Sequence, residues 1–519
     1  SIHGDVVHSR PLPVNYGAAG VTVYYGANDG ALRAVDASNG KERWAYVAPE
    51  HFSKLERLKN NDPCVDYKVT GSPCTEDKGY FFDGSIGIYQ AAATGTNPPV
   101  WIYPTQRRGG RMVYAFDVSD PTANPTLKWR HGCDQAGVCD TGFEQMGQTW
   151  STPNVAFING YSPNKDTQPV VVMGGGYDSC EDTDSVISTQ CSGTKGNVVY
   201  FMDADTGALI TSFATARGVA ADVNMIDLNN DGLIDYAYAA DVGGNIYRID
   251  FVSSPTTPTP LPYPTSTNNT SDTSHWFMHR VAYTNSAGQG RKFLFGPGLF
   301  PTGTSNFLAI VSGDREHPLV TDYPYTSLPY PNKAYVYKDD LTSTPSTAAV
   351  NLDLDDDMMN VTDVNNSTCT STNLLSDTSK KGWFMYLNQY GQGEQGVTAA
   401  VIVGGMVTFS TNRPLSSALS CQTRLGEARG YFVNLFNGSG SIGTANNASC
   451  GGSRSVTFAG GGLPPSPVIG IVPIDGVPTA VLIGAPPRDG GSASPIKPSK
   501  INPPINQTRT RTYKYIKTD

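Results

Sequence analysis

The sequence lacks long apolar runs, carries little charge and has no concentration of positive charge. A membrane-spanning helix needs about 20 mostly apolar residues in a row, and no such run occurs in the 519 residues. Charged residues make up only 16% of the chain, and the formal net charge is −9. Nucleic-acid binding relies on clustered Lys and Arg, and we find no basic stripe. We therefore expect no membrane span and no nucleic-acid partner, whereas the negative charge is compatible with cation binding.

Motifs of common enzymatic chemistry are absent as well. The sequence contains no GxSxG, no HExxH and no P-loop, the patterns of serine hydrolases, zinc proteases and nucleoside-triphosphate sites. Three glycines at 174–176 follow an apolar stretch, but they open no predicted helix and so form no phosphate cradle. Because no acid–base constellation presents itself, we expect that the chain is not an enzyme.

The nine cysteines include no Cys-x-x-Cys pair, which argues against a structural zinc site. Three pairs instead flank short polar stretches, as disulfides do in exported proteins. These pairs are Cys64 with Cys74, Cys133 with Cys139, and Cys180 with Cys191. Cys421 and Cys450 form a fourth candidate pair, and Cys369 is left over or is an alternative partner of Cys421. The pattern predicts disulfides and an oxidising compartment, the periplasm or the cell surface.

What the chain has in abundance is turn residues and tyrosine, with 55 Gly, 37 Pro and 27 Tyr. Residues 21–46 have the pattern of three short strands joined by an Asn-Asp-Gly turn and an Asn-Gly turn, which is most of one propeller blade. Copies of a strand that ends in Asp or Asn before a turn begin near residues 112, 197, 245 and 430. Repeats that cannot bury their own faces must stack on neighbours. The sequence therefore predicts an all-β, decorated and modified β-propeller of roughly seven blades.

We expect one propeller domain over residues 1–519, interrupted by insertions. The variable insertions are predicted at about 51–75, 178–195, 253–275 and 360–380. Residues 52–58 favour a short helix, and residues 104–111 form a further polar loop. Alternating residues at 509–515 predict a last strand that closes the ring beside the N-terminal strand.

The most informative stretch is Asp-Leu-Asn-Asn-Asp-Gly-Leu-Ile-Asp at residues 227–235. Oxygen-bearing side chains recur at every second position except Leu233, where an EF-hand-type loop supplies a backbone carbonyl. Gly232 stands where such a loop turns sharply. Three carboxylates within nine residues repel one another unless a cation lies between them. The loop therefore predicts a Ca²⁺ site.

The calcium loop is not a complete EF-hand. Position twelve, which holds a bidentate Glu in that motif, is Tyr238 here, so water or another segment must complete the coordination. Strand patterns rather than helices follow the loop. The alternative is an Asn-Asp-Gly hairpin turn with incidental acids. A second acidic run at 353–357 has no Gly at the turn position, and we expect a solvated strand or loop there.

Several motifs along the chain follow one family pattern. Residues 4–11 have the sequence Gly-Asp-Val-Val-His-Ser-Arg-Pro, and residues 146–153 have Met-Gly-Gln-Thr-Trp-Ser-Thr-Pro. The calcium loop is followed by Tyr-Ala-Ala-Asp-Val-Gly-Gly-Asn at 238–245. In these motifs the chain resembles the C-terminal domain of the PilC/PilY family of type IV pilus biogenesis factors and tip adhesins. Some members carry an Arg-Gly-Asp integrin motif, which is absent here, so integrin binding is not supported.

The resemblance implies a calcium loop whose cation state affects pilus retraction and twitching motility. The ligands that it implies are Asp227, Asn229, Asp231, Asp235 and the backbone carbonyl of Leu233. It also implies control of pilus extension and retraction, and attachment to host cells or surfaces. The implied partners are minor pilins or other components of the pilus tip, with an unidentified receptor. The implied location is the fimbrium, cell surface or outer membrane, after export through the periplasm.

Two rival interpretations stay open. Residues 34–44 are similar to the blade motif of pyrroloquinoline-quinone dehydrogenases, which hold calcium beside the quinone. Those enzymes typically stack the cofactor on a disulfide between adjacent cysteines, and no two cysteines are adjacent here. The other rival is a purely structural propeller stabilised by calcium. A quinone-type absorbance would favour the first rival, and pilus function that does not depend on calcium would favour the second.

Overall fold

The computed structural model describes most of the chain up to residue 500. The described residues are 4–60, 62, 64–66, 74, 76–92, 98–182, 193–251, 273, 276–284, 291–319, 331–341, 349–354, 356–362, 374–375, 377, 379–415, 426–442, 452–458, 461–474, 477–484 and 497–500, the last three strands by their backbone only. They divide into two compact units, each described below by itself. Unit 1 comprises residues 1–297, 301–306 and 339–351, and unit 2 comprises residues 298–300, 307–338 and 352–519. The prediction of a single domain over the whole chain stays a prediction.

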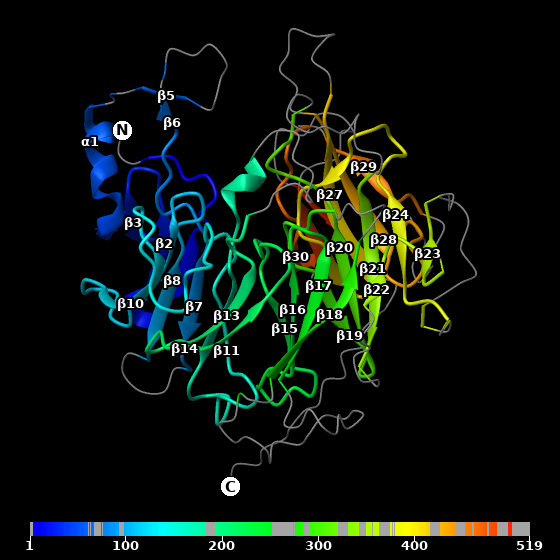
Figure 1. Cartoon of the computed structure of the whole chain (residues 1–519), viewed down its shortest axis with the longest axis horizontal. Helices are drawn as coiled ribbons and strands as arrows, with labels where there is room; N and C mark the ends of the chain where they lie inside the picture. Colours follow the sequence, from blue (N-terminus) through cyan, green and yellow to red (C-terminus); the bar gives the residue numbers. More distant parts are fainter. Residues whose placement is uncertain are drawn as a thin grey trace. The chain divides into compact units, whose positions relative to one another are not determined.

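Unit 1 contains four sheets of four or five strands (Figure 1). The first has the order β1 (Leu12–Asn15), β2 (Val21–Gly26), β3 (Ala31–Asp36), β4 (Glu42–Val47). The second has the order β10 (Thr126–Cys133), β9 (Arg111–Asp117), β8 (Val100–Pro104), β7 (Ile86–Gln90). The third has the order β11 (Asn154–Ala156), β12 (Val170–Gly174), β13 (Val198–Asp203), β14 (Leu209–Ala214). The fourth has the order β15 (Asn224–Ile226), β16 (Tyr236–Ala240), β17 (Asn245–Phe251), β18 (Trp276–Tyr283), β22 (Val350–Asn351).

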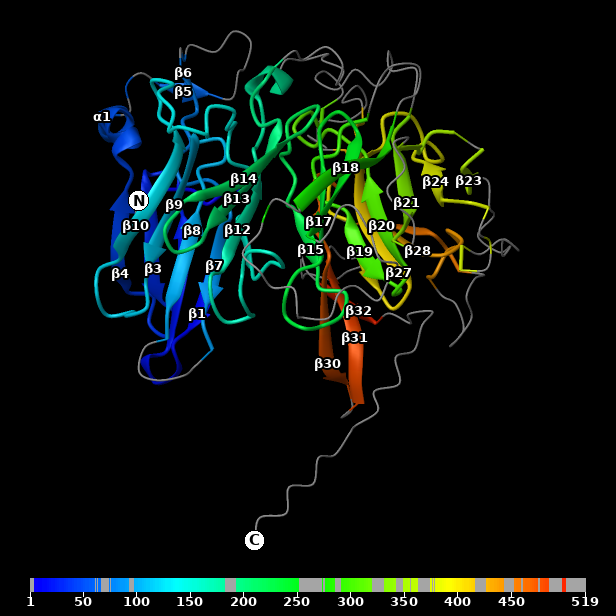
Figure 2. The ribbon, with the colours of Figure 1, turned by 60° about the horizontal axis from the view of Figure 1, so that its bottom comes forward.

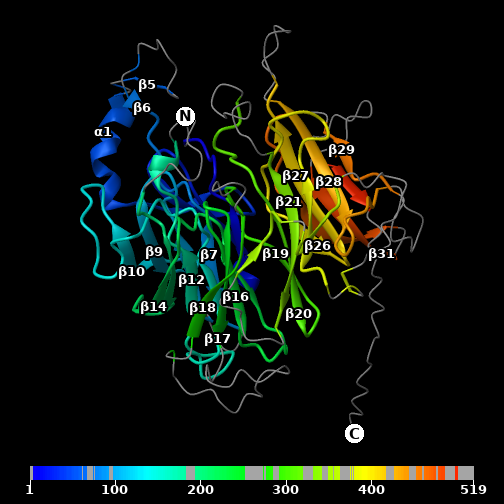
Figure 3. The same cartoon turned by 45° about the vertical axis from the view of Figure 1, so that its right-hand side comes forward.

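Unit 2 contributes most of three further sheets, in which β27 and β28 form a long pair (Figure 3). The fifth sheet has the order β19 (Gly298–Pro301), β20 (Ser305–Val311), β21 (Lys333–Asp340), β24 (Gly382–Tyr386), β23 (Met358–Asn360). The sixth has the order β25 (Gln395–Gly396), β27 (Met406–Arg413), β28 (Glu427–Asn434), β29 (Ser455–Thr457), with β26 (Val401–Val403) also paired to β27. The seventh has the order β30 (Val468–Ile474), β31 (Val477–Gly484), β32 (Lys497–Lys500) (Figure 2). Seven sheets of three to five strands, counted over the described residues, match the predicted number of blades.

The core of unit 1 forms because successive side chains of its inner strands point to opposite faces of the sheet, and both faces are covered. All five residues of β12 are buried, because this strand has a neighbouring sheet on each face. Val171 and Met173 pack with residues of β8 and β9, whereas Val170 and Val172 pack with residues of β16 and β17. Burying a side chain of this size contributes about 1.5–3 kcal/mol. Continuous apolar strands therefore encode stacked blades, as expected for sheets that are covered on both faces.

The Asp or Asn that ends most of the repeated strands closes the turn after it, whereas Asp250, at the end of the copy that begins near residue 245, binds Arg248 instead. The side-chain oxygen of Asp36 accepts the backbone N–H of Ser38 at 2.8 Å, and that of Asp117 accepts the N–H of Ser119 at 2.9 Å. Asp203 and Asn434 accept turn N–H groups in the same way. Such Asx turns give the backbone donors a partner that strand pairing no longer provides. The repeat seen in the sequence is thus a repeated turn.

The insertion after the first sheet contains the predicted helix. Helix α1 (Phe52–Asn60) follows the 3-10 turn η2 (Pro49–His51), and β5 (Val65–Asp66) pairs with β6 (Glu76–Asp77) beyond it. Two further 3-10 turns are η1 (Gly17–Ala19) and η3 (Ser179–Asp182). Within the described ranges, α1 is the only α-helix, and no helix has the length and apolar character needed to cross a membrane. Most of the insertions at 253–275 and 360–380, and the predicted strand at 509–515, lie outside the described residues.

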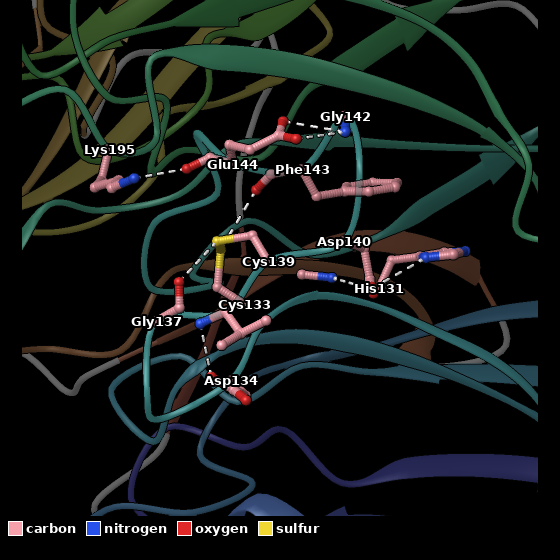
Figure 4. The surroundings of a disulfide bond; sticks show 12 residues. His131, Cys133, Asp134, Gly137, Cys139, Asp140, Gly142, Phe143, Glu144 and Lys195 are labelled. Carbon is pink, nitrogen blue, oxygen red and sulfur yellow. Dashed lines mark hydrogen bonds and ion pairs between the residues drawn. A yellow bond between two sulfur atoms is a disulfide. The ribbon is translucent and has the colours of Figure 1, made fainter.

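Two of the predicted disulfides are present, and a third is half described. Cys64 bonds to Cys74, and Cys133 bonds to Cys139 with the two Cα atoms 3.9 Å apart (Figure 4). Cys180 is also in a disulfide, but its predicted partner lies outside the described residues, as do Cys369, Cys421 and Cys450. The two complete bonds each close a short polar loop, as the spacing predicted.

The acidic run at 353–357 was expected to be solvated, and the structure contradicts this expectation at Asp353. The side chain of Asp353 is only 3% exposed, and its carboxylate lies 2.8 Å from the ammonium of Lys333. The same oxygen accepts the hydroxyl of Tyr335 at 2.9 Å. The lysine is 20 positions away in sequence, so the acidic run alone gave no sign of this buried ion pair.

Candidate metal site in the loop between β15 and β16

The loop at 227–235 is a hairpin connection held at both ends. β15 and β16 pair in antiparallel fashion, with Ile226 opposite Tyr236. The N–H of Asp235 donates to the carbonyl of Ile226 at 2.9 Å, which closes the loop at its base. Ile234 also forms a parallel bridge to Ile158. The loop is therefore anchored to two strands and to the segment that follows β11.

The backbone of the loop turns at Asn230 and Gly232, which have φ angles of 60° and 92°. Positive φ costs little for Gly and is tolerated by Asn. A Cβ atom on Gly232 would lie 2.7 Å from the Cβ of Lys165, so the position is restricted both by angle and by space. Gly232 therefore lies at a sharp turn of the loop, as the sequence predicted.

The side-chain oxygens of the first half of the loop accept its own backbone N–H groups. The two carboxylate oxygens of Asp227 accept the N–H of Asp231 at 3.2 Å and of Gly232 at 2.8 Å. Asn229 also accepts the N–H of Asp231, at 2.9 Å. An ionised carboxylate has about four lone-pair positions, so these bonds leave acceptor capacity for a cation.

Asp231 and Asn229 are also joined through their side chains. The Asn229 amide donates to Asp231 at 3.1 Å, and the other oxygen of Asp231 accepts the N–H of Leu233 at 2.8 Å. The side chain of Leu233 is buried, which fixes this part of the loop to the core. The three polar residues 227, 229 and 231 thus form one connected hydrogen-bonded turn.

Asp235 is the buried member of the set, with 1% of its surface exposed. Burial raises the pKa of its carboxyl to about 6, the N–H of Leu228 acts in the opposite direction, and the carboxylates of Asp231 and Asp227 raise it further. The Leu228 N–H lies 2.8 Å from the carboxylate oxygen. A cation beside Asp235 would offset both the burial and the repulsion.

The residues fit calcium in donor type, with three carboxylates and one carboxamide oxygen on a tight loop. Within the part of the chain that the structure describes, however, no three His, Cys, Asp or Glu side chains gather closely enough to hold a metal ion. The structure thus brings the five predicted residues onto one anchored loop. The calcium site itself stays a prediction.

Tyr238, at the position of the missing EF-hand Glu, belongs to a different cluster. Its buried hydroxyl donates to Asp339 at 2.8 Å, and the Arg248 guanidinium donates to the same carboxylate at 3.0 Å. Arg248 also binds Asp250 through two nitrogens. Sequence analysis missed this buried network because Arg248 and Asp339 are 91 positions apart. The alternation of Arg248 and Asp250 on one strand was the only available signal.

Comparison with known proteins agrees with this fold. A family model described as the PilY1 beta-propeller domain matches residues 15–283. The type IV pilus biogenesis factor PilY1 of Pseudomonas aeruginosa strain PAO1 is 29% identical over 239 residues, which cover 44% of this chain and 17% of that protein. A PilY1 homolog from Xylella fastidiosa is 24% identical and covers 84% of this chain and 27% of its own length. The chain thus spans about a quarter or less of these relatives.

A solved structure supports the same architecture. The crystal structure of the Pseudomonas aeruginosa PilY1 C-terminal domain aligns with a TM-score of 0.59 and 18% identity, covering 89% of this chain and 90% of that one. At this identity the match speaks for the fold alone. Together with the seven sheets, it confirms the predicted decorated β-propeller.

Proposed function

This chain belongs to the PilY1 β-propeller family, and from that premise we propose that it is a calcium-binding module of a type IV pilus biogenesis factor and tip adhesin. Its curated relatives are named as type IV pilus biogenesis factors rather than as enzymes. The module acts with minor pilins or other components of the pilus tip and with a receptor on host cells or other surfaces. Its place is the fimbrium or the outer surface of the cell, reached through the periplasm.

The observation that carries the calcium part is the burial of Asp235 on an anchored loop that also bears the carboxylates of Asp227 and Asp231. Asp227, Asn229, Asp231, Asp235 and the carbonyl of Leu233 would hold the ion. Bound calcium would supply positive charge that neutralises these acids. Without that charge the three carboxylates repel one another, and the hydrogen bonds from the loop N–H groups must hold the turn alone. The order of the loop then depends on the cation.

Cation-dependent order in this loop is the proposed link to pilus extension and retraction. The loop joins β15 to β16 and is bonded to the segment 157–159. A change in the loop therefore reaches the adjoining surface of unit 1 without requiring the blade core to rearrange. Twitching motility and attachment are the processes expected to respond.

A calcium titration of the purified chain tests the metal site. We expect calcium to raise the melting temperature of the parent, because a ligand that binds only the folded state adds about 2.7 kcal/mol at one hundred times its dissociation constant. Asp231→Ala should lose this shift and keep the β-rich circular dichroism spectrum.

Asp120→Ala is the matched control, since Asp120 also caps an exposed turn through the N–H of Thr122 but lies outside the loop. A parent chain whose melting temperature and loop signals ignore calcium would overturn the metal site. A quinone-type absorbance after reconstitution would instead favour the dehydrogenase interpretation.

A further inference from the structure

A polar cavity in unit 1 lies apart from the calcium loop. Its volume is about 390 Å³, within the range of small-molecule sites. We call it the Arg111 cavity, and the residues that matter here are Lys54, Arg108, Arg111, Asp134, Asp178 and Lys195. They come from α1, the loop at 104–111, the disulfide loop of Cys133 and Cys139, and the segments on either side of η3. The polar insertions between blades thus converge on one hollow.

The cavity concentrates positive charge in a chain of net charge −9. Four cations and two carboxylates line it. Arg108 is already bound to Asp182 through two nitrogens. Among the described residues, Lys54, Arg111 and Lys195 form no ion pair, and Lys195 donates instead to the carbonyl of Glu144 at 2.6 Å (Figure 4). Three cations are therefore available to an anionic ligand.

The carboxylates in the wall limit what kind of anion fits. Asp178 accepts the N–H groups of Cys180 and Lys195, both at 3.0 Å, and Asp134 accepts the N–H of Val138 at 2.8 Å. A compact inorganic anion gains nothing from these acceptors and is repelled by them. A ligand with hydroxyl groups as well as an acidic group can donate to the carboxylates and accept from the cations.

A strained and incompletely bonded segment lies behind the same wall. The side chain of Gln106 is 0% exposed, and neither its amide oxygen nor its amide nitrogen has a hydrogen-bond partner. Its amide fills the space where a side chain on Gly110 would lie, beside the amide of Gln135, and Gly110 and Gln135 both line the cavity. Unpartnered buried polar groups are rare and call for an explanation. Here they leave hydrogen-bonding capacity next to the hollow.

The backbone beside Gln106 is strained as well. Arg107 has a φ of 46°, and its guanidinium lies 4.0 Å from the centre of the Trp150 ring. Positive φ in a residue with a long side chain costs about 1–2 kcal/mol, and such strain gathers at ligand sites. The contact with Trp150 holds the loop at 104–111 in this conformation.

From these features we infer that the Arg111 cavity binds an acidic sugar unit, a hydroxyl-rich ring that carries one carboxylate. Arg111 and Lys195 hold the carboxylate, and the carbonyls, amides and acids of the wall bind the hydroxyl groups. The small residues Gly109, Gly110 and Gly137 leave the main chain accessible to the ring. This site is independent of the calcium loop and goes beyond the proposed function.

Titration calorimetry with galacturonate, galactose, sodium sulfate and a glutamate-containing tripeptide tests the inference on the purified chain. We expect galacturonate to bind at least ten times more tightly than galactose, with an affinity that falls as salt rises. Arg111→Gln and Lys195→Gln should each weaken galacturonate at least tenfold, and Arg111→Lys should restore part of the loss.

Two controls separate this site from the rest of the molecule. Lys41→Gln removes an exposed cation from the turn before β4 and should bind galacturonate like the parent. Asp231→Ala should do so too, whatever happens to calcium, so failure of the calcium proposal leaves this test intact. Circular dichroism identifies any variant that fails to fold.

Four outcomes would overturn the inference. Equal binding of galactose would show that the charge is irrelevant, and equal binding of sulfate would reduce the cavity to a simple anion site. Tighter binding of the tripeptide would make it a peptide site. No binding of galacturonate at about 10 mM, which corresponds to a binding free energy weaker than about 3 kcal/mol, would show that the hollow holds no such ligand.

Discussion

Gly232 and Gly20 separate two effects that act together in the calcium loop. Both have positive φ, at 92° and 82°. A Cβ on Gly232 would collide with Lys165, whereas a Cβ on Gly20 would meet nothing within 4 Å. The backbone angle alone penalises both positions, and the lack of space penalises only the first.

Gly232→Ala should therefore destabilise the chain by about 1–2 kcal/mol from the angle, with a further loss from the displaced Lys165, and should lower calcium affinity. Gly20→Ala should cost only the angle term and leave calcium binding unchanged. Urea unfolding and calcium titration of both variants check this. Equal stability and equal affinity in the two variants would contradict the role given to Gly232.

His51 makes the chain sensitive to acid through burial. It is enclosed by the rings of Phe81 and Phe82, 5.0 and 5.6 Å away between ring centres. Burial, with a smaller contribution from Lys54, lowers the pKa of His51 to about 4. Below pH 6.5 the unfolded chain takes up a proton at this residue and the folded chain does not, so stability falls until the pH nears 4.

We expect the free energy of unfolding of the parent to fall by about 3 kcal/mol between pH 7 and pH 4 because of His51. His51→Leu should remove that part of the acid sensitivity, because the leucine has no proton to bind and remains compatible with the two phenylalanines. Unfolding measured at pH 7, 5.5 and 4 gives the difference between the two chains. If the curves of parent and variant run parallel over this range, the burial argument fails.

At the scale of elements, the disulfide between Cys133 and Cys139 closes a turn at the end of β10. A loop of about six residues gains about 2 kcal/mol from cross-linking in the chain-entropy model. The double variant Cys133→Ser, Cys139→Ser should lose roughly this much stability.

The loss should be local, because the loop is joined to the blade through the pairing of β10 with β9. Thermal unfolding of the parent and the double variant measures the loss, and the parent under reducing conditions is the control. A double variant as stable as the oxidised parent would show that the polar bonds of the loop suffice. Galacturonate binding should weaken in the same variant, since Asp134 and Gly137 lie on this loop.

The elements themselves were largely predictable because their signals are local. The three strands within residues 21–46, the helix at 52–58 and the loop between two strands at 227–235 all follow from turn residues and apolar alternation. The structure places them at β2–β4, α1 and the β15–β16 connection. The Asp or Asn that ends most of the repeats was visible too, since the turn that it caps is only two or three residues away.

What the sequence could not show are contacts between distant segments. Asp353 pairs with Lys333, and Asp339 pairs with Arg248 on another strand, so neither acid is solvated. The six residues named in the Arg111 cavity come from five separated segments, and no spacing rule links them. The calcium loop, in contrast, was recognisable because all its predicted ligands lie within nine residues.

At the scale of the whole molecule, the stacked blades of unit 1 separate folding from function. The core lies between sheets, in clusters such as that of Val170, Val172 and Ile249, while the charged loops lie at the strand connections. Changes in a connection therefore alter a surface without removing core contacts. This division is typical of a scaffold that carries its function in loops.

The last prediction places Asp231→Ala in the full-length protein in cells that twitch by type IV pili. We expect normal protein levels, because Asp231 lies in a strand connection and not in the core, and we expect altered extension and retraction. Chelating calcium should reproduce this phenotype in the parent and have no further effect in the variant, since both remove the same interaction.

Asp120→Ala is again the matched control. Cells that carry it should twitch like cells with the parent protein when calcium is present, and they should respond to chelation. If Asp231→Ala loses calcium binding in the purified chain yet the cells twitch and adhere normally, the ion only stabilises the propeller. The pilus would then depend on other surfaces of the chain. Variants in the Arg111 cavity would be the next to compare, because none of the residues that line it belongs to the loop at 227–235.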